Sequence, residues 1–384
     1  MGACETVRLD AFSTDELSRY SRQINLRELG EEGQRRLKAA RVLCIGAGGL
    51  GSPAALYLAA AGTGTIGIID DDVVELSNLH RQLLHGAHDV QQLKVDSAAH
   101  RLGDLNPHIA IETHATRFTA ANARELISEY DVVIDGSDNL PTRYLSNDVC
   151  VWLRKPNIYG SVHQFEGQAS LFAPHLGAPC YRCLFPEPPP RGSVPTCAEA
   201  GVLGVVPGLI GTIQALETIK LITGIGDNLL GRLLHIDCLS LRMREFNIRR
   251  DPDCPVCGKA PTITEPVEYE QPCAVSTAAV SEISPLELHT MISRGEAVTL
   301  LDVREPFEFE IARIDGAQLI PLGDVPERLG EIPRGGTTVV YCKSGLRSTH
   351  AITFLRGKGF DSLVNLAGGI DAWRAQIDPA LPKY

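Results

Sequence analysis

The sequence predicts an α/β protein in which a large Rossmann-like domain is followed by a smaller α/β domain. Strand-like apolar runs alternate with helix-like segments between residues 41 and 137, and such alternation is typical of a doubly wound parallel sheet. A G-x-G-x-x-G motif at Gly46, Gly48 and Gly51 follows the first strand-like run and precedes an alanine-rich helix. This arrangement favours a dinucleotide-binding turn.

The elements of the first domain are expected in the following order. Ser13 is a typical N-cap for a helix over residues 15–24. Strands are expected over residues 41–46, 65–70, 109–118 and 131–137, and helices over 52–62, 93–106 and about 208–223. Residues 157–174 favour further strands, and a proline-rich loop is expected over residues 185–195.

The second domain is expected to start with a helix near residue 285. Its strands are expected over residues 297–305, 337–342 and 362–369. The stretch before it contains several prolines and no clear hydrophobic period, which predicts a linker over residues 266–284.

Composition restricts the class of protein. The 384 residues carry a formal net charge of -11, which argues against a general surface for nucleic acids or anionic membranes. No uninterrupted apolar stretch is expected to span a membrane, and the N-terminus lacks an apolar signal region. We therefore expect a cytoplasmic protein.

Four of the eleven cysteines form two close pairs, Cys180 with Cys183 and Cys254 with Cys257. A reducing cytosol disfavours disulfides. Four thiolates in two Cys-x-x-Cys pairs can complete a closed tetrahedral zinc site that ties distant segments together. The sequence therefore predicts a structural Zn²⁺ site, with four reduced thiols as the alternative.

The residues after the glycine motif distinguish ATP from a nicotinamide cofactor. Asp70, which ends the second strand-like run, suits the ribose of either nucleotide. Asn78, Arg81 and Lys94 follow, and Asp138 comes directly after a buried-type strand. An amide, two cations and a carboxylate suit a triphosphate with Mg²⁺, whereas hydride transfer does not require this set.

Five blocks in this order carry a family resemblance: "SRQI", "GAGGLG", "SNLHRQ", Lys94 and "SDNLPTR". Residues 12–265 thereby resemble the adenylating domain of ubiquitin-activating enzymes and of molybdopterin-synthase and thiazole-synthesis adenylyltransferases. The resemblance implies a homodimer that binds ATP and Mg²⁺ and adenylates the C-terminal glycine of a small ubiquitin-like protein. Members of this family commonly carry the paired cysteines as a structural zinc site.

The same resemblance implies roles for individual residues. Asp70 would bind ribose, Asp138 would hold the metal with Asn139 beside it, and Arg22 would reach the triphosphate of the partner subunit. The implied nucleotide-binding residues also include Gly46, Gly48, Gly49, Ser77, Asn78, Leu79, His80, Arg81 and Lys94.

Cys197 follows the proline-rich loop. The resemblance allows it to accept the acyl group as a thioester, to take part in an acyl disulfide, or to be dispensable. A packed thiol at the start of a helix is equally consistent with the sequence.

Cys342 ends a strand-like run and is followed by a glycine-containing loop, an arginine and a helix. Backbone N–H groups around such a loop favour a thiolate. The Cys-x4-Arg spacing differs from the Cys-x5-Arg of related phosphatases. With "LLDVREPFEFE" and "NLAGGIDAW", residues 285–384 resemble a single rhodanese domain, which implies a persulfide on Cys342. Asp302 and Arg304 are expected to organise its loop, and "IARIDGA" departs from the usual histidine-containing form of that segment.

Together the two resemblances imply an adenylyltransferase and sulfurtransferase. The first domain would adenylate a sulfur-carrier protein ending in Gly-Gly, and sulfur from Cys342 would convert the adenylate to a thiocarboxylate. Such enzymes serve molybdenum-cofactor synthesis, tRNA thiolation or related routes, and a cysteine desulfurase or another donor would supply the sulfur. Two alternatives are an activator that conjugates through a Cys197 thioester and a nicotinamide oxidoreductase with a rhodanese sensor.

Overall fold

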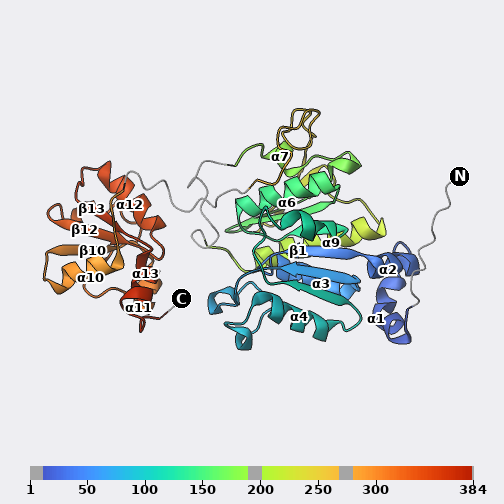
Figure 1. Ribbon diagram of the computed structural model, residues 1–384, viewed down its shortest axis with the longest axis horizontal. Helices are drawn as coiled ribbons and strands as arrows, with labels where there is room; N and C mark the ends of the chain where they lie inside the picture. Colours follow the sequence, from blue (N-terminus) through green and yellow to red (C-terminus); the bar gives the residue numbers. More distant parts are fainter. Residues whose placement is uncertain (1–11, 189–200, 268–279, 383–384) are drawn as a thin grey trace. The chain divides into compact units, whose positions relative to one another are not determined.

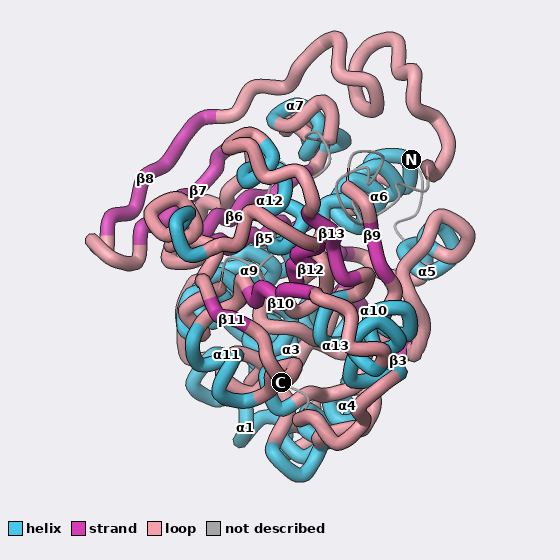
Figure 2. The backbone as a smooth tube through the Cα atoms, turned by 90° about the vertical axis from the view of Figure 1, so that its left-hand side faces the viewer, coloured by secondary structure: helices cyan, strands magenta, loops and turns pink. Residues whose placement is uncertain are grey.

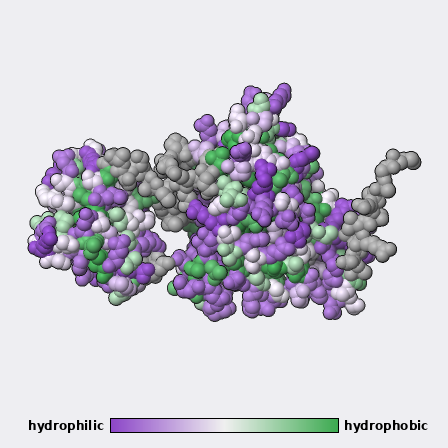
Figure 3. Space-filling view, viewed as in Figure 1, coloured by the Kyte–Doolittle hydropathy of each residue, from purple (hydrophilic) through white to green (hydrophobic). Residues whose placement is uncertain are grey.

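The computed structural model describes residues 12–188, 201–267 and 280–382. The described chain forms two compact units, the first ending at residue 267 and the second starting at residue 280 (Figure 1). Each unit is built around its own sheet. Apolar residues lie between polar ones on the viewed surface of both units (Figure 3).

The first unit contains an eight-stranded sheet in the order β3-β2-β1-β4-β5-β6-β7-β8. Its strands are β1 (Arg41–Ile45), β2 (Thr65–Ile69), β3 (Ala110–His114), β4 (Val132–Asp135), β5 (Asn157–His163), β6 (Glu166–Phe172), β7 (Arg232–Asp237) and β8 (Arg242–Asn247). The pairs from β3 to β5 are parallel, and those from β5 to β8 are antiparallel. The α/β fold predicted from the sequence is thus confirmed.

Helices cover both faces of the parallel half because β1 is apolar on both sides. Val42 and Cys44 pack in the core that contains α3 and α4, whereas Leu43 and Ile45 pack in the core that contains α5 and α6. The helices of this unit are α1 (Thr14–Ile24), α2 (Gly30–Ala39), α3 (Gly51–Ala61), α4 (Lys94–Leu105), α5 (Ala123–Ser128), α6 (Leu140–Leu153), α7 (Tyr181–Leu184) and α9 (Val205–Thr223).

The predicted N-cap of α1 is confirmed. Ser13 Oγ accepts the backbone N–H of Glu16 at 3.2 Å, and the Glu16 carboxylate accepts the backbone N–H of Ser13 at 2.8 Å. This reciprocal capping box satisfies two backbone donors that the first turn leaves unpaired.

Among the described residues, α9 is one helix that is long and apolar enough to cross a membrane by length and composition alone. Gln214, Glu217 and Lys220 interrupt its sequence, so it is not the uninterrupted apolar stretch whose absence was expected. The helix packs against α3, β5 and β6 as a core element. Its Gln214 is fully buried and donates to the carbonyl oxygens of Asp135 and Ile158.

The edge of the large sheet was not predicted. Strand β8 pairs only with β7, and all six of its residues are exposed (Figure 2). An edge strand of this kind has no buried face to impose a clear alternation of apolar and polar residues.

The second unit contains a five-stranded parallel sheet in the order β11-β10-β12-β13-β9. Its elements are β9 (Glu282–Ile283), α10 (Pro285–Ser293), β10 (Val298–Asp302), α11 (Pro306–Ile311), β11 (Gln318–Leu319), β12 (Thr337–Tyr341), α12 (Leu346–Arg356), β13 (Leu363–Leu366) and α13 (Gly369–Gln376). Strand β9 lies within the stretch expected to be a linker, and it pairs with β13.

Candidate functional site

A polar cleft of about 320 Å³ lies at the carboxyl ends of β1, β2 and β4. The strand order reverses between β1 and β4, and ligands bind in doubly wound sheets at such switch points. The predicted residues that line this cleft are Gly46, Gly48, Gly49, Asp70, Arg81, Lys94, Asp138 and Asn139. The structure therefore brings together residues as far apart in the chain as Gly46 and Asn139.

The glycine loop requires residues without side chains at two positions. Gly46 has a φ of +96°, and its N–H donates to the carbonyl of Ile69 at 2.8 Å. A Cβ atom on Gly51 would lie 1.9 Å from the carbonyl oxygen of Gly46. The loop can close onto the start of α3 only because neither residue carries a side chain.

Asp70 faces the loop at the end of β2. Its carboxylate accepts backbone N–H groups of Ala47 and Asp72, both at 2.9 Å. Burial raises the pKa of Asp70, and the nearby ammonium of Lys94 opposes this shift. Each carboxylate oxygen keeps acceptor capacity for a ribose hydroxyl.

Lys94 is buried at the first position of α4. Its Nζ lies 2.7 Å from Asp72 Oδ2 and 3.7 Å from Asp70 Oδ1. A buried ammonium beside two carboxylates and a glycine loop supplies fixed positive charge where phosphate groups would lie.

Five residues of the "SNLHRQ" block were predicted to bind the nucleotide, and of these Arg81 lines the cleft. Its Nη1 donates to the Ser77 carbonyl at 3.2 Å and lies 2.9 Å from His80 Nε2. Ser77, Asn78, Leu79 and His80 do not line the cleft. Within one chain, the Ser77 carbonyl and the His80 ring contact the Arg81 guanidinium.

Asp138 and Asn139 follow β4 but differ in environment. Asn139 caps α6, where its Oδ1 accepts the N–H of Thr142 at 3.0 Å. Asp138 is exposed at the cleft. Its carboxylate is thus the more accessible oxygen donor for a divalent cation.

Two cleft residues were not singled out from the sequence. Gln82 and Arg143 are both more than nine-tenths buried, and Gln82 Oε1 and Arg143 Nε have no hydrogen-bond partner among the described residues. Both belong to blocks that were recognised, "SNLHRQ" and "SDNLPTR", so a signal was present. Unpaired buried polar atoms in a cleft fit a polar ligand.

His85 was also missed, and it acts behind the glycine loop. Its Nε2 lies 3.0 Å from the Ala47 carbonyl and its Nδ1 lies 2.9 Å from Ser97 Oγ. Because a carbonyl only accepts, Nε2 carries the proton. Burial lowers the pKa of His85, which favours the neutral imidazole.

Of the remaining two predicted residues, only Arg22 can be placed relative to this cleft. Arg22 is exposed in the last turn of α1 and does not line the cleft of its own chain. Cys197 lies outside the residues that the structure describes.

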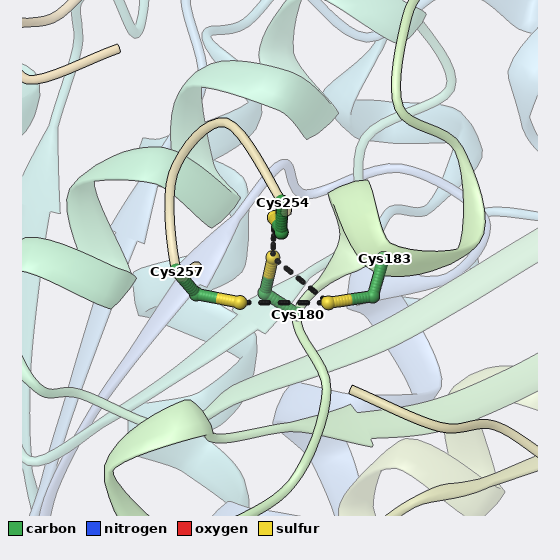
Figure 4. A group of neighbouring side chains, drawn as sticks. All are labelled: Cys180, Cys183, Cys254 and Cys257. Carbon is green, nitrogen blue, oxygen red and sulfur yellow. Dashed lines mark hydrogen bonds between the residues drawn. The ribbon is translucent and has the colours of Figure 1, made fainter. Parts of the chain in front are cut away.

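The two cysteine pairs meet in space (Figure 4). Cys180 and Cys183 flank the start of α7, and Cys254 and Cys257 lie on a loop after β8. The Sγ–Sγ distances are 3.5 Å for Cys180–Cys254, 3.4 Å for Cys183–Cys257 and 3.9 Å for Cys180–Cys183. All four sulfur atoms lie within 4.8 Å of one another.

This spacing fits a zinc ion. Four sulfurs at about 2.3 Å from Zn²⁺ would lie about 3.8 Å apart at the corners of a tetrahedron. The hydrogen bond with Cys180 lowers the pKa of Cys183, toward the thiolate form that binds metals. The set offers four thiolates and no open position, as in structural sites.

In the second unit, Cys342 is buried at the end of β12. The Gly345 N–H donates to its Sγ at 3.1 Å, and Gly345 has a φ of +102°. The N–H of Ile370, in the first turn of α13, donates to the Cys342 carbonyl at 2.9 Å. The loop thus directs a backbone donor at the sulfur.

Asp302 and Arg304 lie behind this loop. They form a fully buried ion pair, and the Arg304 guanidinium lies 5.5 Å from the Tyr341 ring centroid. Arg304 Nη2 also donates to the Ala312 carbonyl at 2.7 Å.

Comparison with known proteins identifies the families of both domains. The ThiF family matches residues 20–256. The chain belongs to this family. A rhodanese-like domain matches residues 284–376.

Relatives that align over nearly the whole chain are named as both adenylyltransferases and sulfurtransferases. The probable adenylyltransferase/sulfurtransferase MoeZ of Mycobacterium tuberculosis is 48% identical, over 97% of each chain. The adenylyltransferase and sulfurtransferase MOCS3 of Sus scrofa is 43% identical, over 97% of this chain and 89% of its own. Among solved structures, E. coli MccB with MccA-N7isoASN superposes with a TM-score of 0.57 at 25% identity, covering 65% of this chain and 76% of that one.

Proposed function

We propose that this enzyme adenylates the C-terminal glycine of a ubiquitin-like sulfur-carrier protein and then converts the adenylate to a thiocarboxylate. The carrier carboxylate attacks the α-phosphorus of ATP and pyrophosphate leaves. The outer sulfur of a Cys342 persulfide then attacks the acyl carbon and AMP leaves, which forms an acyl disulfide. A second thiol cleaves this disulfide, releasing the carrier thiocarboxylate and leaving Cys342 in a disulfide with that thiol.

The observation that carries the proposal is the joint presence of the cleft and the Cys342 loop in one chain. Fixed charge from Lys94 and Arg81 and N–H groups of the glycine loop would hold the phosphates of ATP. Asp70 would bind the ribose. Asp138 would hold Mg²⁺, which when bound supplies positive charge for the departing pyrophosphate.

Several finer assignments belong to the same proposal. The boundaries are 12–265 for the adenylating domain, 266–284 for the linker, whose residues 282–283 form β9 of the second sheet, and 285–384 for the rhodanese domain. Cys180, Cys183, Cys254 and Cys257 would hold a structural Zn²⁺. Arg22 would act in the partner's site of a homodimer, and a cysteine desulfurase or similar donor would load Cys342. A reducing cytoplasm suits these thiols.

The test uses purified enzyme, ATP, Mg²⁺, a sulfane sulfur donor, a thiol reductant and a small carrier ending in Gly-Gly. Intact-mass spectrometry should show the carrier gaining 16 mass units, because sulfur replaces oxygen, only when ATP is present. A carrier that stays unmodified with every component present would contradict the proposal.

Two variants separate the half-reactions. Cys342→Ala should keep carrier-dependent ATP–pyrophosphate exchange and lose thiocarboxylate formation. Asp138→Ala should lose exchange and still form the Cys342 persulfide. If Cys197 instead formed a thioester, the carrier adduct would form without sulfur donor and would disappear in Cys197→Ala.

A further inference from the structure

A row of three polar side chains runs from Cys342 to the edge of the small sheet. Ser348 Oγ lies 3.5 Å from Cys342 Sγ and 2.7 Å from Asn365 Oδ1. Asn365 Nδ2 lies 2.9 Å from Glu282 Oε1. Cys342, Ser348 and Asn365 are all at least 98% buried, whereas Glu282 is exposed.

Strand pairing fixes the outer end of this row. Glu282 is the register partner of Asn365 in the parallel pair of β9 and β13. The Asn365 N–H donates to the Ser281 carbonyl at 2.8 Å, and the Ala367 N–H donates to the Ile283 carbonyl at 2.9 Å. Strand β9 is the first described element after residues 268–279.

Glu282 determines which way the Asn365 amide faces. An ionised carboxylate only accepts hydrogen bonds, so the amide NH₂ must point at Glu282. The amide oxygen is then left facing Ser348, and it too can only accept.

The orientation of the Asn365 amide in turn determines which atom accepts the Ser348 hydroxyl proton. A hydroxyl has a single proton, and three atoms compete for it: Asn365 Oδ1 at 2.7 Å, the Gly345 carbonyl at 2.9 Å and Cys342 Sγ at 3.5 Å. The two oxygens are closer than the sulfur. Two groups are placed to donate to Cys342 Sγ, the Gly345 N–H at 3.1 Å and the Ser348 hydroxyl at 3.5 Å, and the shorter contacts of the hydroxyl to oxygen leave the Gly345 N–H as the main donor.

We propose that Glu282 and Asn365 are positioning residues that keep the Ser348 hydroxyl from donating to the sulfur of Cys342. The Cys342 thiolate, which attacks the sulfane sulfur of a donor, then stays more nucleophilic, because hydrogen bonding to an anionic sulfur stabilises it and lowers its reactivity. This inference rests on the proposed role of Cys342 in sulfur transfer, but its geometry is independent of the carrier. It also links the strand that follows the inter-domain segment to the chemistry of the loop.

The other charged groups near the loop are distinct from this row. The loop and α12 contribute Lys343 and Arg347, and Arg347 is paired with Glu308 of α11 at 2.6 Å. From α13, the Asp371 backbone N–H contacts the Lys343 carbonyl at 3.1 Å. Behind β12, Asp302 and Arg304 neutralise each other. These groups are the same in wild type and in the variants described below, so their effects on the alkylation of Cys342 cancel when the variants are compared with wild type.

The test is the pH dependence of iodoacetamide alkylation at Cys342 in the full-length protein, followed by peptide mass spectrometry. Ser348→Ala alone should leave the midpoint pH of alkylation within about 0.2 of wild type. Glu282→Gln frees the amide to rotate, which removes the nearer of the two oxygens that compete with the thiolate for the Ser348 proton and leaves the Gly345 carbonyl. It should lower the midpoint by about 0.5 to 1 pH unit, as expected for a hydrogen bond to a charged acceptor in part of the molecules.

The double variant Glu282→Gln/Ser348→Ala separates this route from the loss of a negative charge. It should restore most of the wild-type midpoint, because the proton donor is gone. Glu296→Gln, an exposed carboxylate of the same unit, controls for net charge.

Three results would overturn the inference: a raised midpoint in Ser348→Ala, no shift in Glu282→Gln, or equal shifts in the single and double Glu282 variants. Alkylation requires neither ATP nor a carrier, so these results stay interpretable if no thiocarboxylate forms. Failure of the proposed function alone would instead leave the alkylation pattern intact.

Discussion

Replacing Lys94 by Met tests the nucleotide-binding assignment most directly. The ammonium is buried and lies between the glycine loop and two carboxylates, so methionine keeps the volume and removes only the charge. A hydrogen bond to a charged group contributes about 1.5–3 kcal/mol net. The Kd for ATP measured by calorimetry without carrier should therefore rise roughly 10- to 150-fold.

A second variant distinguishes direct phosphate contact from neutralisation of Asp72. Because Lys94 Nζ lies 2.7 Å from Asp72 Oδ2, its loss also leaves a carboxylate that repels ATP. Asp72 is mostly exposed, so water screens much of that repulsion. Lys94→Met/Asp72→Asn should then recover less than about threefold of the lost affinity.

The control is Lys358→Met, which removes an exposed ammonium from the other unit and should leave the Kd unchanged. Thermal unfolding checks that each variant is folded. Full recovery of ATP affinity in the double variant would refute direct phosphate contact, as would a Lys94→Met variant that binds ATP like wild type.

Three further predictions concern metal, pH and packing. Atomic absorption should find one zinc per chain in wild type and less in Cys254→Ser, which should also melt at a lower temperature. Equal zinc in variant and wild type would exclude the four-sulfur site. Burial lowers the pKa of His85 below its value in the unfolded chain, so the unfolded chain binds more protons. The free energy of unfolding should therefore fall as pH drops through about 6.5. In His85→Gln, the slope of the urea-unfolding free energy against pH should flatten. Gly51→Ala places a Cβ atom 1.9 Å from the Gly46 carbonyl oxygen and should strongly destabilise the folded protein. The control Gly103→Ala, in α4, places its Cβ where no atom lies within 4 Å. It should stabilise the fold by about 0.5–1 kcal/mol in the same urea-unfolding assay.

The parts of the fold that were predictable are those with local signals. Strand β1 alternates between two buried faces and ends in the glycine motif, and Ser13 with Glu16 forms a capping box that depends on four consecutive residues. Strand β8 gave no such signal because its residues are all exposed, and β9 has only two residues. Two residues are too few to show a period.

The site shows a similar division. Gly46, Asp70 and Asp138 follow the ends of β1, β2 and β4. The carboxyl ends of parallel strands meet at one edge of a sheet, so the convergence of these residues follows from topology. His85 acts through the Ala47 carbonyl, 38 positions earlier in the chain. No local pattern reveals a contact of that kind, because it depends on how η2 (Ala87–Asp89) and its flanks fold back over the loop.

Burial of Cys342 has a consequence for which sulfur reacts with a protein-sized partner. The residue is 1% exposed, so its thiolate is shielded from a bulky electrophile. A persulfide carries the outer sulfur about 2 Å beyond Sγ. Loading with sulfane sulfur should therefore raise the rate of reaction with a bulky maleimide more than the rate with iodoacetamide. The ratio of these two rates cancels much of the difference in intrinsic nucleophilicity, and a ratio unchanged by loading would mean that Sγ itself is already accessible to large partners.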